Sequence, residues 1–200
     1  LMALLQFTLS GIAFTYYGEE LGIPQARIPL KEGKDPLAKK YEKTPQFLVD
    51  MSSQSLNRDE CRTPMLWDTI ANAGFTEKGV EPWLPVTENY KELAVSTQLA
   101  DSTSLLNFYR KLVCMRKDNY FGMSRVEEFE VKNGVLILKE GMSESGRKIW
   151  YFNLKNKSRK VETLFDEVII STYNEAPQYK NRSLTLKPFE GVVVYVDDCC

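Results

Sequence analysis

The sequence contains no histidine, so the commonest general base and the commonest protein ligand of transition metals are both missing. A Ser-His-Asp catalytic site is therefore excluded. Only four cysteines occur in 200 residues, without zinc-ligand spacing, and they are too few to staple a chain of this length. We expect single buried thiols, assign no role to the closing Cys199-Cys200 pair, and predict neither a metal nor a cofactor.

The chain also lacks an excess of charge of either sign: it has 26 Lys and Arg residues and 27 Asp and Glu residues. This balance argues against nucleic-acid binding and against a polybasic membrane anchor. There is no run of about 18 apolar residues, so we expect no membrane segment in this piece. Two sequons, Asn156-Lys157-Ser158 and Asn181-Arg182-Ser183, leave both a cytoplasmic and a secreted protein open.

The first 117 residues show an α/β pattern, in which helical spacing and a strand-like apolar run alternate. The chain opens without a start methionine inside an apolar pattern over residues 1–9, as the tail of an amphipathic helix in a fragment would. Residues 12–17 are apolar enough for a strand buried on both faces of a parallel sheet. After a long irregular stretch with one short helix around residues 36–43, residues 102–117 have the spacing of a strong amphipathic helix.

Beyond residue 118 the hydrophobic period changes from helical spacing to two, which indicates an all-β unit. Asn133-Gly134 has the composition of a tight hairpin turn between the first two strands. We predict strands at residues 126–131, 135–139, 148–153, 161–165, 168–172 and 192–196.

The segment from Arg58 to Asp68 is the densest candidate for chemistry, because it combines paired charges with Trp67 in an irregular region. Aromatic rings stack on the apolar faces of a sugar, while arginine and aspartate side chains form charge-assisted hydrogen bonds with hydroxyl groups. The alternative is a local ion-pair network that holds the loop.

Tyr17, Glu19 and Glu20 lie at the C-terminal end of the expected parallel strand, where barrel enzymes place their functional groups. Glu19 and Glu20 make a poor catalytic pair, because the two carboxyl groups of a retaining glycosidase lie about 5 Å apart across one bond, whereas sequence neighbours usually point in different directions. Their alternative role is to cap the next segment or to pair with a nearby arginine.

Six segments in this order resemble the last third of maltases and oligo-1,6-glucosidases of the α-amylase superfamily, and together they span almost the whole chain. They are LSGIAFTYYGEELG, NRDECRTPMLWD, NAGFT, PWLPV, NYKELAVSTQLADSTSLLNFYRKLVCMRK and LTLKPFEGVVVYV.

The resemblance implies that residues 1–118 are the C-terminal end of a (β/α)8 TIM barrel, with its last strand, long loop and last helix. Residues 119–200 would form an antiparallel β-sandwich C-terminal domain. It also implies a retaining α-glucosidase that hydrolyses terminal α-linked glucose from oligosaccharides of the maltose or isomaltose type. The catalytic carboxylates and the sugar-binding histidines belong to the remaining N-terminal part of the barrel, so no residue of this chain is expected to be catalytic.

The same resemblance supplies the candidate substrate-binding residues. Arg62 matches the arginine that helps to bind the terminal glucose, and Arg58 and Asp59 match the Arg-Asp pair that precedes it. Tyr17 and Glu19, followed by Glu20, match the segment after the eighth strand, where support rather than catalysis is expected.

Two positions depart from the pattern. Relatives often carry a small residue where this chain has Cys61, and glutamine where it has Leu66. Leu66 leaves the loop with one hydrogen-bonding side chain fewer, which bears on substrate preference.

Other functions stay open. One is a non-catalytic amylase-like heavy chain of an amino-acid transporter. Another is a transglycosylating relative such as a trehalose synthase or a sucrose isomerase. A self-standing carbohydrate-binding or structural module is disfavoured, because an open piece of barrel exposes a strand edge and apolar helix faces.

Overall fold

The computed structural model describes residues 1–51, 56–121, 125–141, 143 and 146–197. Its residues form two compact units, each described by itself. One unit consists of Leu1–Phe14 together with Phe108–Cys200, and the other is Thr15–Asn107. Within the described residues, no helix has the length and apolar content needed to cross a membrane. The Cys199-Cys200 pair lies outside the described residues.

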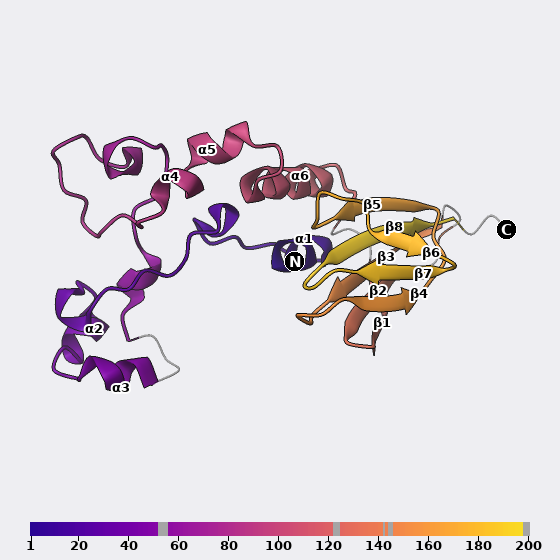
Figure 1. The fold of residues 1–200 in the computed structure, drawn as a ribbon, viewed down its shortest axis with the longest axis horizontal. Coiled ribbons are helices and arrows are strands. Elements are labelled where there is room, and N and C mark those ends of the chain that lie inside the picture. Colours follow the sequence, from indigo (N-terminus) through magenta and orange to yellow (C-terminus); the bar gives the residue numbers. More distant parts are fainter. Residues whose placement is uncertain (52–55, 122–124, 142, 144–145, 198–200) are drawn as a thin grey trace. The chain divides into compact units, whose positions relative to one another are not determined.

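The first unit contains a five-stranded antiparallel sheet in the order β1-β2-β3-β8-β5 (Figure 1). Its strands are β1 (Val126–Lys132), β2 (Val135–Glu140), β3 (Arg147–Asn153), β5 (Glu167–Ser171) and β8 (Gly191–Val196). The predicted hairpin turn is confirmed. Asn133 and Gly134 both have positive φ, 54° and 78°, which a two-residue turn of this kind requires.

A second, three-stranded antiparallel sheet has the order β4-β7-β6. It is formed by β4 (Arg159–Glu162), β6 (Gln178–Lys180) and β7 (Ser183–Leu186). The inward side chains of both sheets share one apolar cluster, in which Val161 and Leu184 of the small sheet meet Ile149 and Val194 of the large one. The all-β unit indicated by the two-residue period and the antiparallel β-sandwich implied by the family resemblance are therefore both confirmed.

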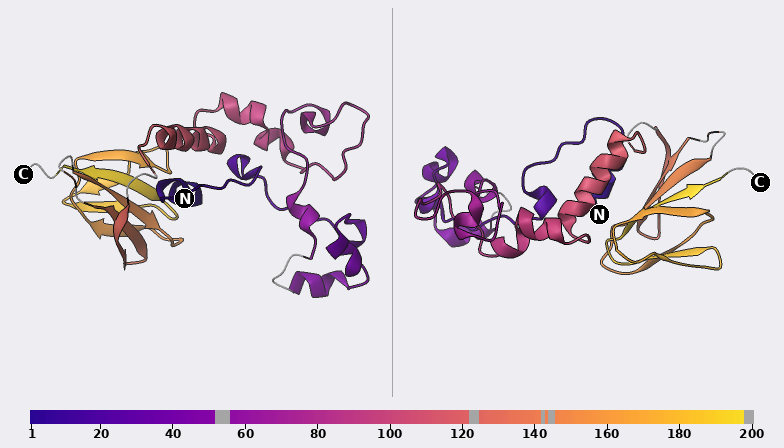
Figure 2. Two further views of the ribbon diagram at one scale, coloured as in Figure 1. Left: turned by 180° about the vertical axis from the view of Figure 1, so that it is seen from behind. Right: turned by 90° about the horizontal axis from the view of Figure 1, so that it is seen from above.

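The opposite face of the large sheet packs against helices α1 (Met2–Thr8) and α6 (Leu105–Lys117), as the views of Figure 2 show. Leu4 and Leu112 from the helices share a buried cluster with Trp150 and Phe152 of β3. The guanidinium of Arg116 also donates a hydrogen bond of 2.7 Å to the carbonyl oxygen of Phe7. These contacts join residues 1–14 and 108–117 to the sheet, while a domain division at residues 118/119 stays a prediction.

The second unit consists of short helices and long irregular connections. Its elements are η1 (Glu19–Leu21), η2 (Leu30–Glu32), α2 (Pro36–Lys40), α3 (Gln46–Met51), η3 (Arg58–Cys61), η4 (Ala71–Gly74), α4 (Tyr90–Leu93) and α5 (Val95–Ala100). Its one buried cluster of note contains only Leu21, Leu66 and Ala73, with partly buried apolar residues around them. Further apolar residues of the unit, Ile28, Leu30, Ala38, Leu84 and Ala94, are buried outside this cluster, so its apolar burial is divided among small groups.

Three sequence predictions were wrong in detail. No strand forms at residues 12–17, where Ile12 and Phe14 are 82% and 78% exposed. A strand exists only through backbone hydrogen bonds to a neighbouring strand, and within the described residues no strand pairs with this segment. The short strands β6 and β7 were missed. Cys61 and Cys114 are exposed thiols rather than buried ones.

Candidate functional site

Tyr17 connects the segment after residue 16 to the loop that carries Arg62. Its hydroxyl lies 3.1 Å from the carbonyl oxygen of Thr63 and 3.3 Å from that of Cys61, one on each side of Arg62 in the sequence. Burial raises the pKa of Tyr17, with the Tyr16 phenol adding to the effect and the Arg62 guanidinium opposing it. The phenol therefore stays protonated at neutral pH and acts as a hydrogen-bond donor.

The turn at residues 18–20 depends on a glycine. Gly18 has φ +88°, and a Cβ there would come within 2.9 Å of the Ile23 side chain, so the backbone conformation and the close packing both require glycine. The Glu20 carboxylate accepts a hydrogen bond of 2.8 Å from the Gly18 N–H. This contact gives Glu20 the local capping role that was the alternative to chemistry, whereas Glu19 is exposed.

Arg58 is held by Asp35, a residue that the sequence did not single out. The Asp35 carboxylate accepts hydrogen bonds of 2.7 Å from both Nε and Nη2 of Arg58, and another of 3.0 Å from the Arg58 backbone N–H. It also accepts the Leu37 N–H as the N-cap of α2. The Arg58 hydrogen bonds hold the pKa of Asp35 far below its ordinary value, so this carboxylate stays ionised at neutral pH.

Asp59 extends the same network in the opposite direction. Its Oδ2 accepts the backbone N–H groups of Lys34 and Asp35 at 2.6 and 2.8 Å, and the residue is 1% exposed. Asn57 receives the Asp59 N–H at 3.1 Å and donates to the Ile28 carbonyl at 2.9 Å. These hydrogen bonds fix residues 28–37 against residues 57–59. They do here what a large apolar core does in other folds.

Arg62 follows this network and ends η3. Its backbone N–H donates to the Asp59 carbonyl at 2.9 Å, which ties its position to the fixed part of the loop. The side chain is partly buried, and its guanidinium makes no hydrogen bond or ion pair with the residues that the structure describes. A guanidinium in this state retains its donors for a ligand.

A cavity of about 210 Å³ lies beside the loop that carries Arg62, although Arg62 is not one of its lining residues. It is lined by Tyr16, Tyr17, Gly18, Glu19, Ile23, Pro24, Gln25, Glu60, Cys61 and Thr63. Two of the predicted residues, Tyr17 and Glu19, face this cavity, and Arg62 stands between two lining residues. Arg58 and Asp59 instead bond to the loop itself. Among the described residues, no group of three or more acidic, cysteine or histidine side chains is placed to hold a metal ion.

The sequence analysis did not identify Asp35 and Asn57 as parts of the site, although the sequence around Asp35 carries a helix-capping signal. An aspartate directly before Pro36 is typical of a helix N-cap with proline at the first helical position. The pairing of Asp35 with Arg58 carries no such signal, because the two residues are 23 positions apart. Leu66, the departure from the family pattern, is fully buried beside Leu21 and Ala73 and serves the small core of its unit.

Comparison with known proteins places these features in a family. The model of "Alpha amylase, catalytic domain" matches residues 1–124. An alpha-glucosidase of Candida albicans is 33% identical over 98% of this chain and 37% of its own length. The salivary alpha-glucosidase of Aedes aegypti is 43% identical over 55% of this chain and 18% of its own length. The chain thus spans about 37% of the length of the first of these relatives.

The fold is similar to that of an isomaltulose synthase mutant from Erwinia rhapontici NX5, solved in complex with D-glucose. The TM-score is 0.80 at 24% identity, covering 98% of this chain and 37% of that one. The fold is that of the last part of a (β/α)8 barrel followed by an antiparallel β-sandwich, as the family resemblance implied. Because the family model matches more than half of its residues, the chain belongs to the alpha-amylase family.

Proposed function

We propose that this chain is part of a retaining α-glucosidase that hydrolyses terminal α-linked glucose from short oligosaccharides. The observation that carries the proposal is the Arg62 guanidinium, which is partly buried and has no hydrogen-bond or ion-pair partner among the described residues, on a loop whose neighbouring residues Cys61 and Thr63 line a cavity. The names of the relatives, alpha-glucosidase and oligo-1,6-glucosidase, support the same substrate class.

In this proposal Arg62 donates hydrogen bonds to hydroxyl groups of the terminal glucose. Tyr17 supports the backbone on both sides of Arg62, and Glu19 lies at the edge of the same cavity. Arg58 and Asp59 contribute by holding the loop through Asp35 and the 34–35 backbone. None of these residues attacks the sugar or protonates the leaving oxygen. Those two steps need a carboxylate pair about 5 Å apart, which we assign to the remaining part of the barrel.

The test is Arg62→Ala in the intact protein. A charge-assisted hydrogen bond contributes about 1.5–3 kcal/mol, so kcat/KM for maltose or isomaltose should fall by about 10- to 100-fold. Lys78→Ala is the control, because Lys78 is an exposed cation of the same unit outside the cavity. Wild-type kinetics in the Arg62 variant would contradict the assignment.

The same assay separates the alternatives. A transglycosylating relative transfers the glucosyl group to a sugar, so product analysis would detect an isomerised disaccharide rather than free glucose. A non-catalytic transporter heavy chain would turn over neither substrate. Its remaining sequence would also lack the aspartate nucleophile and the glutamate acid.

A further inference from the structure

Two sequons of the chain, Asn156-Lys157-Ser158 and Asn181-Arg182-Ser183, have no part in the site around Arg62. Both lie in the β-sandwich, in turns between strands. Asn156 belongs to the connection between β3 and β4, and Asn181 belongs to the turn of the β6-β7 hairpin. A sequon of this kind accepts an N-linked glycan, and its asparagine must reach solvent in the folded protein because the glycan is bulky.

Both asparagines meet this condition. Asn156 and Asn181 are exposed, and neither side-chain amide forms a hydrogen bond with any residue in the described ranges. Asn153, in the same part of the sandwich, is the contrast. It is fully buried and donates to the carbonyl oxygens of Lys157 and Lys187 at 2.8 and 2.7 Å. A glycan on either sequon would therefore displace no internal contact of its asparagine.

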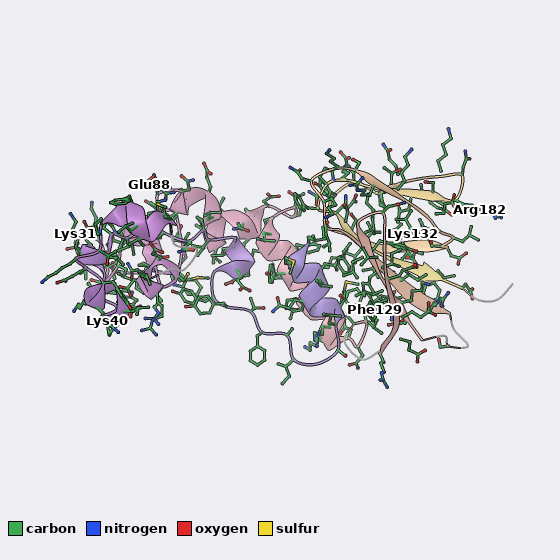
Figure 3. All side chains as sticks on the ribbon, turned by 90° about the horizontal axis from the view of Figure 1, so that it is seen from below. Lys31, Lys40, Glu88, Phe129, Lys132 and Arg182 are labelled. Carbon is green, nitrogen blue, oxygen red and sulfur yellow. The ribbon has the colours of Figure 1, made fainter. Side chains whose placement is uncertain are left out.

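Asn181 lies at the tip of a hairpin. Asn181 and Arg182 have φ values of 51° and 61°, as in a two-residue hairpin turn, and Lys180 pairs with Ser183 across it. Figure 3 shows Arg182 at the margin of the sandwich. Ser183, the third residue of the sequon, begins β7 and is partly exposed. The first and the third residue of this sequon are therefore both accessible from solvent.

The two sequons also lie beside the two edges of the small sheet. Its strand order is β4-β7-β6, so β4 and β6 each have one side without a strand partner among the described residues. Asn156 comes shortly before β4, which begins at Arg159, and Asn181 directly follows β6, which ends at Lys180. Every residue of β6 is exposed, including Tyr179. An exposed strand edge is a template for pairing with another chain, and proteins usually cover or blunt it.

We propose that Asn156 and Asn181 both carry N-linked glycans, which cover the two edges of the small sheet. The donor is a lipid-linked oligosaccharide of the secretory pathway. The side-chain amide nitrogen forms a bond with the anomeric carbon of the first sugar and loses one proton, and the lipid diphosphate leaves. A hydrated glycan beside each edge keeps a second chain from adding a strand there. The modification does not depend on the sugar-binding role proposed for Arg62.

The first experiment is mass spectrometry of the intact protein, purified from the cells in which it is naturally made. Peptides that contain Asn156 or Asn181 should carry the mass of a sugar chain, and peptide:N-glycosidase should remove it. Asn133 is the internal control. It occupies an exposed hairpin turn with φ 54°, but Val135 stands where a sequon requires serine or threonine. Sugar-free peptides at either sequon, or a sugar chain on Asn133, would overturn the assignment.

Ser183→Ala separates recognition of the sequon from exposure of the asparagine. The variant keeps Asn181 at the tip of the same hairpin but removes the hydroxyl group that the sequon requires, so Asn181 should lose its glycan. Ser183→Thr restores a hydroxyl group and should keep the glycan. The corresponding Ser158→Ala variant should lose the glycan on Asn156 alone. Wild-type glycan occupancy in both alanine variants would contradict the proposal.

The covering role is tested by removing the glycans from the folded protein. Sedimentation should show more self-association after enzymatic deglycosylation, and the increase should grow with protein concentration. Gln178→Lys places a charge on the exposed edge strand β6 and should reduce that increase. Asn89→Lys, which adds the same charge at an exposed position of the 15–107 unit, should not. A deglycosylated protein that self-associates no more than the glycosylated one would overturn the covering role.

Discussion

The β-sandwich and the 15–107 unit are stabilised in different ways. The sandwich unit buries two apolar clusters, one on each face of its large sheet. Three of its six pairs of neighbouring strands, β1-β2, β2-β3 and β6-β7, are joined by short connections. The 15–107 unit buries three apolar residues in its own cluster and relies on Asp35, Asn57 and Asp59 to hold its loops. A unit held by apolar burial keeps its stability when exposed polar residues are substituted. A hydrogen-bond network is strongly destabilised when one partner is removed, because the remaining buried groups are left unsatisfied. The candidate sugar site lies in the second kind of region.

The largest effect is expected in the sandwich unit, from Phe152→Ala. Phe152 is fully buried against α1 and α6, and truncating a buried phenylalanine typically costs about 3–5 kcal/mol of unfolding free energy. Urea denaturation of the chain would measure the loss, and hydrogen exchange would locate it in β2, β3 and β8.

Phe129→Ala is the matched control for that experiment. Phe129 lies on the edge strand β1 and is 79% exposed. Its side chain is labelled in Figure 3. Surface substitutions usually change stability by less than about 0.5 kcal/mol. Equal effects of the two variants would mean that the apolar cluster does not carry the stability of this unit.

In the 15–107 unit, the corresponding test is Asp35→Asn. The amide places an NH₂ donor against the donors of Arg58 and removes the charge that pairs with the guanidinium. We expect a several-fold loss of hydrogen-exchange protection at residues 34–37 and 57–59 at pH 6, with little change in the sandwich. Glu88→Gln is the control, because Glu88 is an exposed carboxylate of the same unit.

The sign of the pH dependence follows from the pKa of Asp35, which the Arg58 hydrogen bonds depress in the folded state. A depressed pKa stabilises the fold fully above the unfolded-state value of about 4 and progressively less as pH falls below it. As pH falls below about 4, the hydrogen-exchange protection of the wild type should therefore approach that of the Asp35→Asn variant. A difference that stays constant down to acid pH would exclude the ion pair as its cause.

The same contrast explains what could be predicted from the sequence. The helix ending at Lys117 and the strands of the large sheet follow from hydrophobic period, because each buries one face against a core. β6 and β7 were missed because they are short and their turn has Arg182 where a glycine would have signalled a hairpin. The Asp35 network could not be predicted, since a hydrogen-bonded pair separated by 23 residues leaves no periodic trace.

The smallest effect on stability is expected from Tyr17→Phe, where the hydroxyl bonds to the Thr63 and Cys61 carbonyls are lost. Because Tyr17 is 43% exposed, water replaces part of these bonds and the cost should be near the lower limit for a hydrogen bond, about 0.5 kcal/mol. Tyr41→Phe, which removes the hydroxyl of another exposed tyrosine, should cost less still.

The effect on activity should be larger than the effect on stability, because the lost bonds support the backbone on both sides of Arg62. In the intact protein, KM for maltose should rise while kcat changes little, since Arg62 is proposed to bind the terminal glucose rather than to take part in bond cleavage. The pKa of Tyr17 is raised by burial, so the phenol is protonated throughout the neutral range and the KM effect should be the same at pH 6 and pH 8. An unchanged KM together with the small loss in stability would restrict Tyr17 to a structural contact, and would remove the connection between this loop and substrate binding.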